Sequence, residues 1–155
     1  METNLNRVFL SIEEMQKLTS YGLDTSDARY CYVKKNTEEY DGSYEGSLNS
    51  SMSVVPYDEF CKTNENSVIP TYTAEELLNK IPHRLECFDE ELAFDFEMWK
   101  SINKEDGNIY WILAFIPDEN CPEDIMELNY VINENLLDAA YEMLLWALKY
   151  NYIKQ

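Results

Sequence analysis

The chain has 155 residues, 30 acidic against 12 basic, and a formal net charge of −18 at pH 7. An apolar fraction of 45% supplies a core, so a wholly disordered chain is excluded. Residues 105–148 hold no Lys or Arg and 10 acids, whereas binding to nucleic acid or to anionic membranes needs clustered basic residues. We therefore expect neither of these as a direct partner, and a basic protein partner is favoured.

The first 69 residues predict a helix, a strand and a long loop. Ser11 and Glu14 have the spacing of a capping box, which predicts a helix over 12–20, and Gly22 stands where a left-handed residue ends a helix. Residues 29–35 are rich in aromatic and β-branched side chains and predict a strand. Residues 36–53 have no clean period and predict a mobile loop, followed by a short extended piece over 54–60.

The middle of the chain predicts a helix followed by an antiparallel hairpin. Thr73 and Glu76 repeat the capping-box spacing, and Pro82 ends that helix. From residue 92 to residue 99 apolar and polar side chains alternate, which predicts a half-buried strand. Asp106-Gly107 predicts the turn, and the apolar run 109–116 predicts a second strand covered on both faces.

The C-terminal part predicts an acidic loop over 118–127, then a continuation of this loop or a short strand over 128–132, and a long final helix. Asn135 is the expected N-cap. The apolar residues that follow form one broad stripe on the helix: Leu136, Leu137, Ala140, Tyr141, Leu144, Leu145 and Leu148. We expect this helix to pack on the hairpin 92–116, although a second copy of the chain could also cover its apolar side in a homodimer.

The expected fold class is α+β: a small, mainly antiparallel sheet packed against a long amphipathic C-terminal helix and shorter helices. We expect a single domain, 1–155, in which residues 36–69 form a loop-rich connector between an N-terminal helix–strand segment (1–35) and the main core (70–155). The N-terminus has no basic region followed by a long apolar run, and no two cysteines form a C-x-x-C pair. Reduced thiols in a cytoplasmic protein are therefore expected.

Most recognisable active-site patterns are absent from the sequence. A single histidine, His83, rules out a multi-histidine zinc site within one chain, and the P-loop, G-x-G-x-x-G and G-x-S-x-G motifs are missing. We expect no catalytic residues, no metal and no cofactor. One enzymatic alternative remains, a small hydrolase that uses either Asp95 with Glu97 or His83 with a cysteine.

A partner-binding face is the main candidate site. Alternation along the strand places Asp95, Glu97 and Trp99 on one side of it. The acidic loop that follows the hairpin adds carboxylates to the candidate set: Asp118, Glu119, Glu123 and Asp124. Such a face would attract a positively charged protein, and the binding would weaken as salt is added.

The second half of the sequence resembles small phage- or prophage-encoded proteins of uncharacterised function. The residues that carry the resemblance lie within 70–153: Pro70-Thr71-x-Thr73-x-Glu75-Glu76-Leu77-Leu78, then Tyr110-Trp111-x-x-x-Phe115, then Asn135-Leu136-Leu137-Asp138-Ala139-Ala140-Tyr141-Glu142-Met143-Leu144-x-Trp146. The resemblance implies a cytoplasmic protein of mobile-element origin and supplies no catalytic residue.

Three functions are consistent with these features. The leading hypothesis is a non-enzymatic acidic accessory or interaction protein that binds a protein partner. The second is a DNA mimic that inhibits a nucleic-acid-binding protein, which requires carboxylates in two phosphate-like rows. The third is the small hydrolase, which requires a concave pocket beside its catalytic groups.

Overall fold

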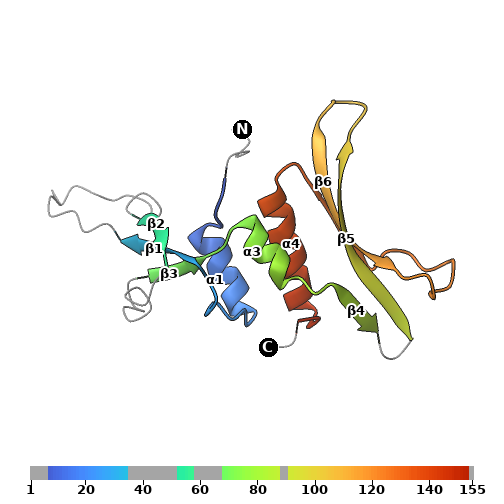
Figure 1. The fold of residues 1–155 in the computed structure, drawn as a ribbon, viewed down its shortest axis with the longest axis horizontal. Coiled ribbons are helices and arrows are strands. Elements are labelled where there is room, and N and C mark those ends of the chain that lie inside the picture. Colours follow the sequence, from blue (N-terminus) through green and yellow to red (C-terminus); the bar gives the residue numbers. More distant parts are fainter. Residues whose placement is uncertain (1–6, 35–51, 58–67, 88–90, 154–155) are drawn as a thin grey trace. The chain divides into compact units, whose positions relative to one another are not determined.

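A computed structural model describes residues 7–34, 52–57, 68–87 and 91–153 (Figure 1). The chain divides into two compact units, each with a sheet of its own. The N-terminal unit is Phe9–Thr73, and the C-terminal unit is Ala74–Gln155 with Met1–Val8. The described residues form two antiparallel sheets and three helices, which confirms the predicted α+β class.

The N-terminal unit is built from one helix and a three-stranded sheet. Helix α1 (Ile12–Ser20) has the predicted capping box, in which Ser11 Oγ accepts from the Glu14 N–H and Glu14 Oε2 accepts from the Ser11 N–H. Gly22 follows with φ of 90°, the left-handed conformation expected at that position. Strand β1 (Tyr30–Lys34) lies between β2 (Met52–Pro56) and β3 (Val68–Thr71).

Strand β2 lies inside the segment 36–69 that was expected to be a connector, and β3 begins at the end of that segment. Both pair antiparallel with β1, so Cys31 lies between Val55 on one side and Pro70 on the other. Residues 35–51, which hold nearly all of the predicted loop 36–53, lie outside the described residues, as do 58–67. The mobility of this loop stays a prediction.

The C-terminal unit contains a four-stranded antiparallel sheet in the order β4-β5-β6-β7. Its elements are α3 (Ala74–Lys80), β4 (Arg84–Cys87), β5 (Leu92–Ile102), β6 (Ile109–Pro117), β7 (Asn129–Asn133) and α4 (Leu136–Lys149). The predicted hairpin is confirmed, and Gly107 adopts φ of 73° in its turn. Strand β4 was not anticipated as a separate element, because four residues are too few to show a period.

Helix α4 packs on one face of this sheet, over β6 and β7, and α3 packs against α4. Figure 1 shows α4 along one side of the sheet. Asn135 caps the helix as predicted, with Oδ1 accepting from the N–H groups of Leu137 and Asp138. The rings of Phe115 and Trp146, 5.7 Å apart, join strand and helix. Four of the seven stripe residues are therefore buried within the chain (Leu137, Ala140, Leu144 and Leu148), while the other three are half-buried (Leu136, Tyr141 and Leu145).

The expectation that β6 is covered on both faces is correct only for the centre of the strand, where Leu113, Ala114 and Phe115 are buried. Towards its ends Ile109 is exposed and Ile112 is half-buried. One layer of helices covers one face of a sheet, and the described part of the C-terminal unit has no helix on the other. The described helices also include none that is long and apolar enough to cross a membrane.

Candidate functional site

The uncovered face of the four-stranded sheet is the candidate site, and we call it the open face. Directly opposed residues of antiparallel strands point to the same side of the sheet, so the strand register identifies the members. The open face consists of Arg84 and Glu86 of β4, Ala93, Asp95, Glu97, Trp99 and Ser101 of β5, Tyr110, Ile112, Ala114 and Ile116 of β6, and Tyr130 and Ile132 of β7. The predicted grouping of Asp95, Glu97 and Trp99 on one side of a strand thus agrees with the register.

The half of the open face near β7 is apolar and accessible. Tyr130 is 55% exposed, Ile132 51% and Trp99 40%. Trp99 stands opposite Ile112, which in turn stands opposite Ile132, so these side chains form a row across three strands. Contiguous apolar side chains on an uncovered surface are typical of a place where another molecule binds.

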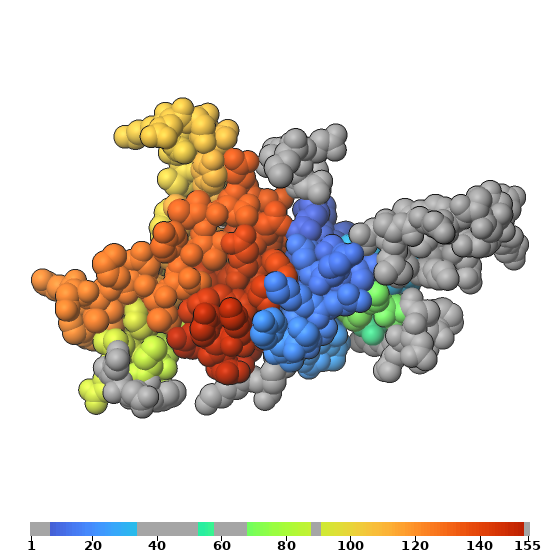
Figure 2. Space-filling view, turned by 180° about the vertical axis from the view of Figure 1, so that it is seen from behind, coloured from blue at the N-terminus to red at the C-terminus, as the bar shows by residue number. Residues whose placement is uncertain are grey.

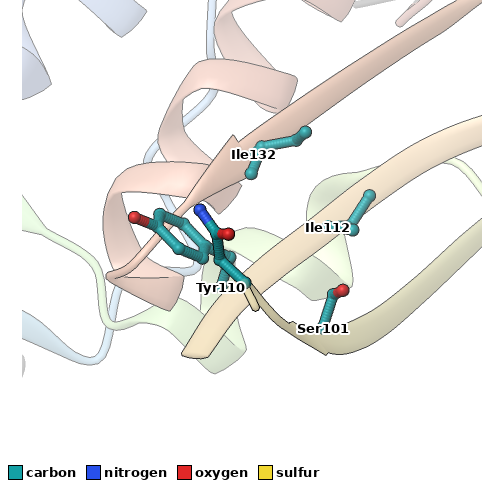
Figure 3. A pocket seen from close by; sticks show the side chains of 5 residues that line it. Ser101, Tyr110, Ile112 and Ile132 are labelled. Atoms are coloured by element: carbon teal, nitrogen blue, oxygen red, sulfur yellow. The ribbon is translucent and has the colours of Figure 1, made fainter. Parts of the chain in front are cut away.

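A shallow hollow of about 450 Å³ lies at the hairpin end of this apolar row (Figure 3). Its walls are Ser101, Asn103, Tyr110, Ile112 and Ile132. Tyr110 is fixed by Asp106 in the turn, whose Oδ2 accepts from the tyrosine hydroxyl at 2.9 Å, and this hydrogen bond raises the pKa of Tyr110. Figure 2 shows the hairpin tip, in yellow, standing out from the rest of the C-terminal unit.

The half of the open face near β4 is polar and organised around Arg84. Its Nη1 donates to Asp95 at 2.8 Å and its Nη2 to Asp118 at 2.6 Å, while Nε lies 3.7 Å from Glu86. The hydrogen bond to Asp118 is the main cause of a raised pKa for Arg84, and the same bond lowers the pKa of Asp118. Two of the carboxylates that we expected to face a partner are thus already paired within the chain.

The other expected binding residues lie apart from this cluster. Glu97 is exposed on the open face, and no ion pair reaches it from the described residues. The acidic loop holds Glu119, Glu123 and Asp124, all three exposed. The structure therefore divides the predicted set into paired carboxylates (Asp95 and Asp118), exposed carboxylates (Glu97, Glu119, Glu123 and Asp124) and an accessible aromatic residue, Trp99.

Two features of this site were missed in the sequence. Arg84 was missed because its partners Asp95 and Asp118 are 11 and 34 residues away, and only the order of strands brings them together. Tyr130 and Ile132 were missed because the segment around them was too short to assign. A single Tyr-x-Ile alternation was the one available signal.

Of the two residue sets of the enzymatic alternative, Asp95 and Glu97 lie two residues apart on the open face, where Arg84 binds Asp95. His83 is exposed before β4, and its carbonyl accepts from the Phe96 N–H. Cys31, Cys87 and Cys121 form no disulfide, while Cys61 lies outside the described residues. Within the described ranges, no group of three or more His, Cys, Asp or Glu residues is arranged to hold a metal ion.

No protein-family model, curated protein or solved structure matches this chain. The site is therefore interpreted from its own geometry.

Proposed function

We propose that this protein is a non-enzymatic binding protein and that the open face contacts a protein partner. The observation that carries the proposal is the row of accessible apolar side chains, Trp99, Ile112 and Ile132, on a sheet face that has no helix on it in the described part of its unit. Interfaces between proteins are enriched in aromatic residues at their centre and have a polar rim.

The partner is expected to be basic. Glu97 adjoins the apolar row, and the chain from residue 105 to residue 148 contains 10 acids without a Lys or Arg. The basic residue of β5, Lys100, is on the opposite face, with its Nζ 4.5 Å from the ring centre of Trp111. A cytoplasmic location and a mobile-element origin remain parts of this proposal, and the DNA mimic and the small hydrolase remain the alternative functions.

A photo-crosslinking pair tests the proposal. A benzoylphenylalanine replaces Trp99 on the open face in one variant and Ile102 in the other, which is the matched control because Ile102 is exposed on the opposite face of the same strand. Irradiation of the expressed full chain in cells of its source should give a discrete adduct with another protein from position 99 only. The same adducts from both positions, or none from position 99, would contradict the proposal.

Salt dependence provides a second readout on the captured partner. A basic partner bound beside Glu97 should lose affinity as ionic strength rises, because mobile ions screen exposed charges. The Glu97→Gln variant should bind more weakly at low salt and depend less on salt than the wild type. An affinity that stays flat from low to high salt would show that the interface does not depend on charge.

A further inference from the structure

The outer edge of β7 lacks the features with which proteins protect an edge strand from pairing with another chain. Charged residues and prolines at an edge discourage such pairing. The other three sheet edges carry them, since β4 has Arg84 and Glu86, β2 ends at Pro56 and β3 contains Pro70. Strand β7, with the sequence NYVIN, has neither a charge nor a proline.

The hydrogen-bond alternation of the sheet shows which backbone groups point to this edge. At one end of the β5–β6 pair, the Asn103 N–H donates to the Asn108 carbonyl at 2.9 Å, and at the other end the Asp118 N–H donates to the Ala93 carbonyl at 2.9 Å. Hydrogen-bonded pairs recur at every second residue of an antiparallel ladder. The even-numbered residues of β6 therefore direct their backbone groups to β5, and the odd-numbered residues direct theirs to β7.

The same alternation applies to β7. The odd-numbered residues of β6 stand opposite Asn129, Val131 and Asn133, whose backbone groups consequently point inward. Tyr130 and Ile132 must then direct their N–H and C=O groups to the outer edge, and no backbone bond to another described residue engages them there. The two most accessible large apolar residues of the open face thus also present backbone groups that no other described residue engages.

Carboxylates lie at both ends of this edge. Glu127 precedes β7 by two residues and Glu134 follows it directly, seven residue steps or about 23 Å in an extended chain. Both side chains are half-buried, and Glu134 Oε1 accepts from Asn108 Nδ2 at 3.4 Å, a neutral donor that does not offset its negative charge. An extended partner segment bound alongside β7 would therefore lie with a carboxylate of this chain near each of its ends. Segments with Lys or Arg at both ends complement this pattern.

We propose that the partner supplies an extended segment that adds to β7 as a fifth strand. The backbone of this segment bonds to Tyr130 and Ile132, its aromatic or β-branched side chains extend the apolar row, and its terminal Lys or Arg residues meet Glu127 and Glu134. The inference rests on the proposed function and deepens it, because it names the part of the partner that binds.

A second copy of the chain fits this edge less well. Two β7 strands paired antiparallel about Val131 would bring Glu127 of one copy close to Glu134 of the other at each end of the interface. Each copy also carries a net charge of −18. Like charges oppose this pairing, so the occupant is a basic segment of another protein.

The experiment selects linear peptides of 12 random residues, displayed on phage, against the full chain. We expect the selected sequences to have Lys or Arg on both sides of a short run of aromatic and β-branched residues. Hydrogen exchange measured with a selected synthetic peptide should show new protection at Tyr130 and Ile132. Selected peptides that lack basic ends would overturn the inference. So would a bound peptide that gives no new protection of the Tyr130 and Ile132 amides.

Two variants separate edge binding from face binding. Ile132→Pro removes the outward N–H while leaving the inward bonds of β7 in place, and Ile132→Ala shortens the side chain but keeps the N–H. Addition of a strand predicts about a tenfold loss of affinity for Ile132→Pro and a smaller loss for Ile132→Ala. Equal losses would place the peptide on the face alone, which would overturn the inference and leave the proposed function standing.

A change in the peptide avoids any effect on folding of the protein. Methylation of the backbone nitrogens that point toward β7 should abolish binding to the wild-type chain, whereas methylation of the alternate nitrogens should not. Equal effects of the two patterns would overturn the inference. A dimer of the wild type in sedimentation velocity that Ile132→Pro converts to a monomer would also overturn it, because the edge would then be occupied by a second copy.

Discussion

Arg84 Nη2 lies 2.6 Å from Asp118 Oδ2, although β4 and the turn after β6 are separated by the whole of β5 in the order of strands. The Asp118 side chain is only 9% exposed. A guanidinium that also binds Asp95 on the intervening strand therefore ties three neighbouring segments together across the open face. This relationship predicts how stability depends on pH.

Replacement of Arg84 by Gln should lower the midpoint of thermal unfolding at neutral pH. The pKa of Asp118 is below its ordinary value of 3.8 because Arg84 binds the ionised form. Its contribution to stability is thus present above pH 3.8 and is lost as the pH falls through the folded-state pKa. The difference between wild type and variant should shrink in that acidic range. Lys104→Gln, which changes net charge equally but lies in the hairpin turn, should show no such convergence.

Tyr110 should ionise later than an ordinary tyrosine. Its hydrogen bond to Asp106 raises its pKa above 10.0. The stabilisation from this bond is present below pH 10 and is lost as the pH rises through the folded-state pKa. In an NMR titration of labelled tyrosines, Asp106→Asn should lower the pKa of Tyr110 toward 10. Glu105→Gln removes a neighbouring carboxylate that does not bind Tyr110 and should leave the titration unchanged.

Loss of the cap on α4 should weaken the C-terminal unit. Asn135 Oδ1 accepts from the Leu137 N–H at 2.8 Å and from the Asp138 N–H at 3.2 Å, so Asn135→Ala leaves both donors without that acceptor. The expected loss of unfolding free energy is about 1 kcal/mol in urea denaturation followed by circular dichroism. Asn135→Ser retains a hydroxyl acceptor and should recover most of this loss. Equal losses in the two variants would argue against a capping role.

The contact between sheet and helix should dominate stability. Phe115 is fully buried and packs on Phe96 and Trp146, with ring centres 5.4 and 5.7 Å away. Phe115→Ala should cost about 3–5 kcal/mol, a large part of the stability of a small domain. Ile102→Ala, on the same strand pair but 66% exposed, should change stability by less than about 0.5 kcal/mol. Denaturant titrations of both variants provide the comparison.

The sequence predicted the elements whose signals are local. The capping box of Ser11 and Glu14 and the turn at Gly107 each lie within a few residues, and the apolar stripe of the final helix repeats at intervals of a few residues along 136–148. All three elements are observed. Alternation along β5 also gave the correct grouping of Glu97 with Trp99. These assignments succeeded because hydrogen bonds and side-chain periodicity over one or two turns fix such structures.

The tertiary structure decided what depends on neighbouring strands. An apolar run such as 109–116 is compatible with cover on two faces or on one, and the packing of α4 on β6 and β7 decided that one face has no helix on it in the described unit. The pairing of Arg84 with Asp118 and the position of β7 at an edge follow from strand order alone. Strand order is set by contacts between residues distant in the sequence, for which local periodicity holds no information.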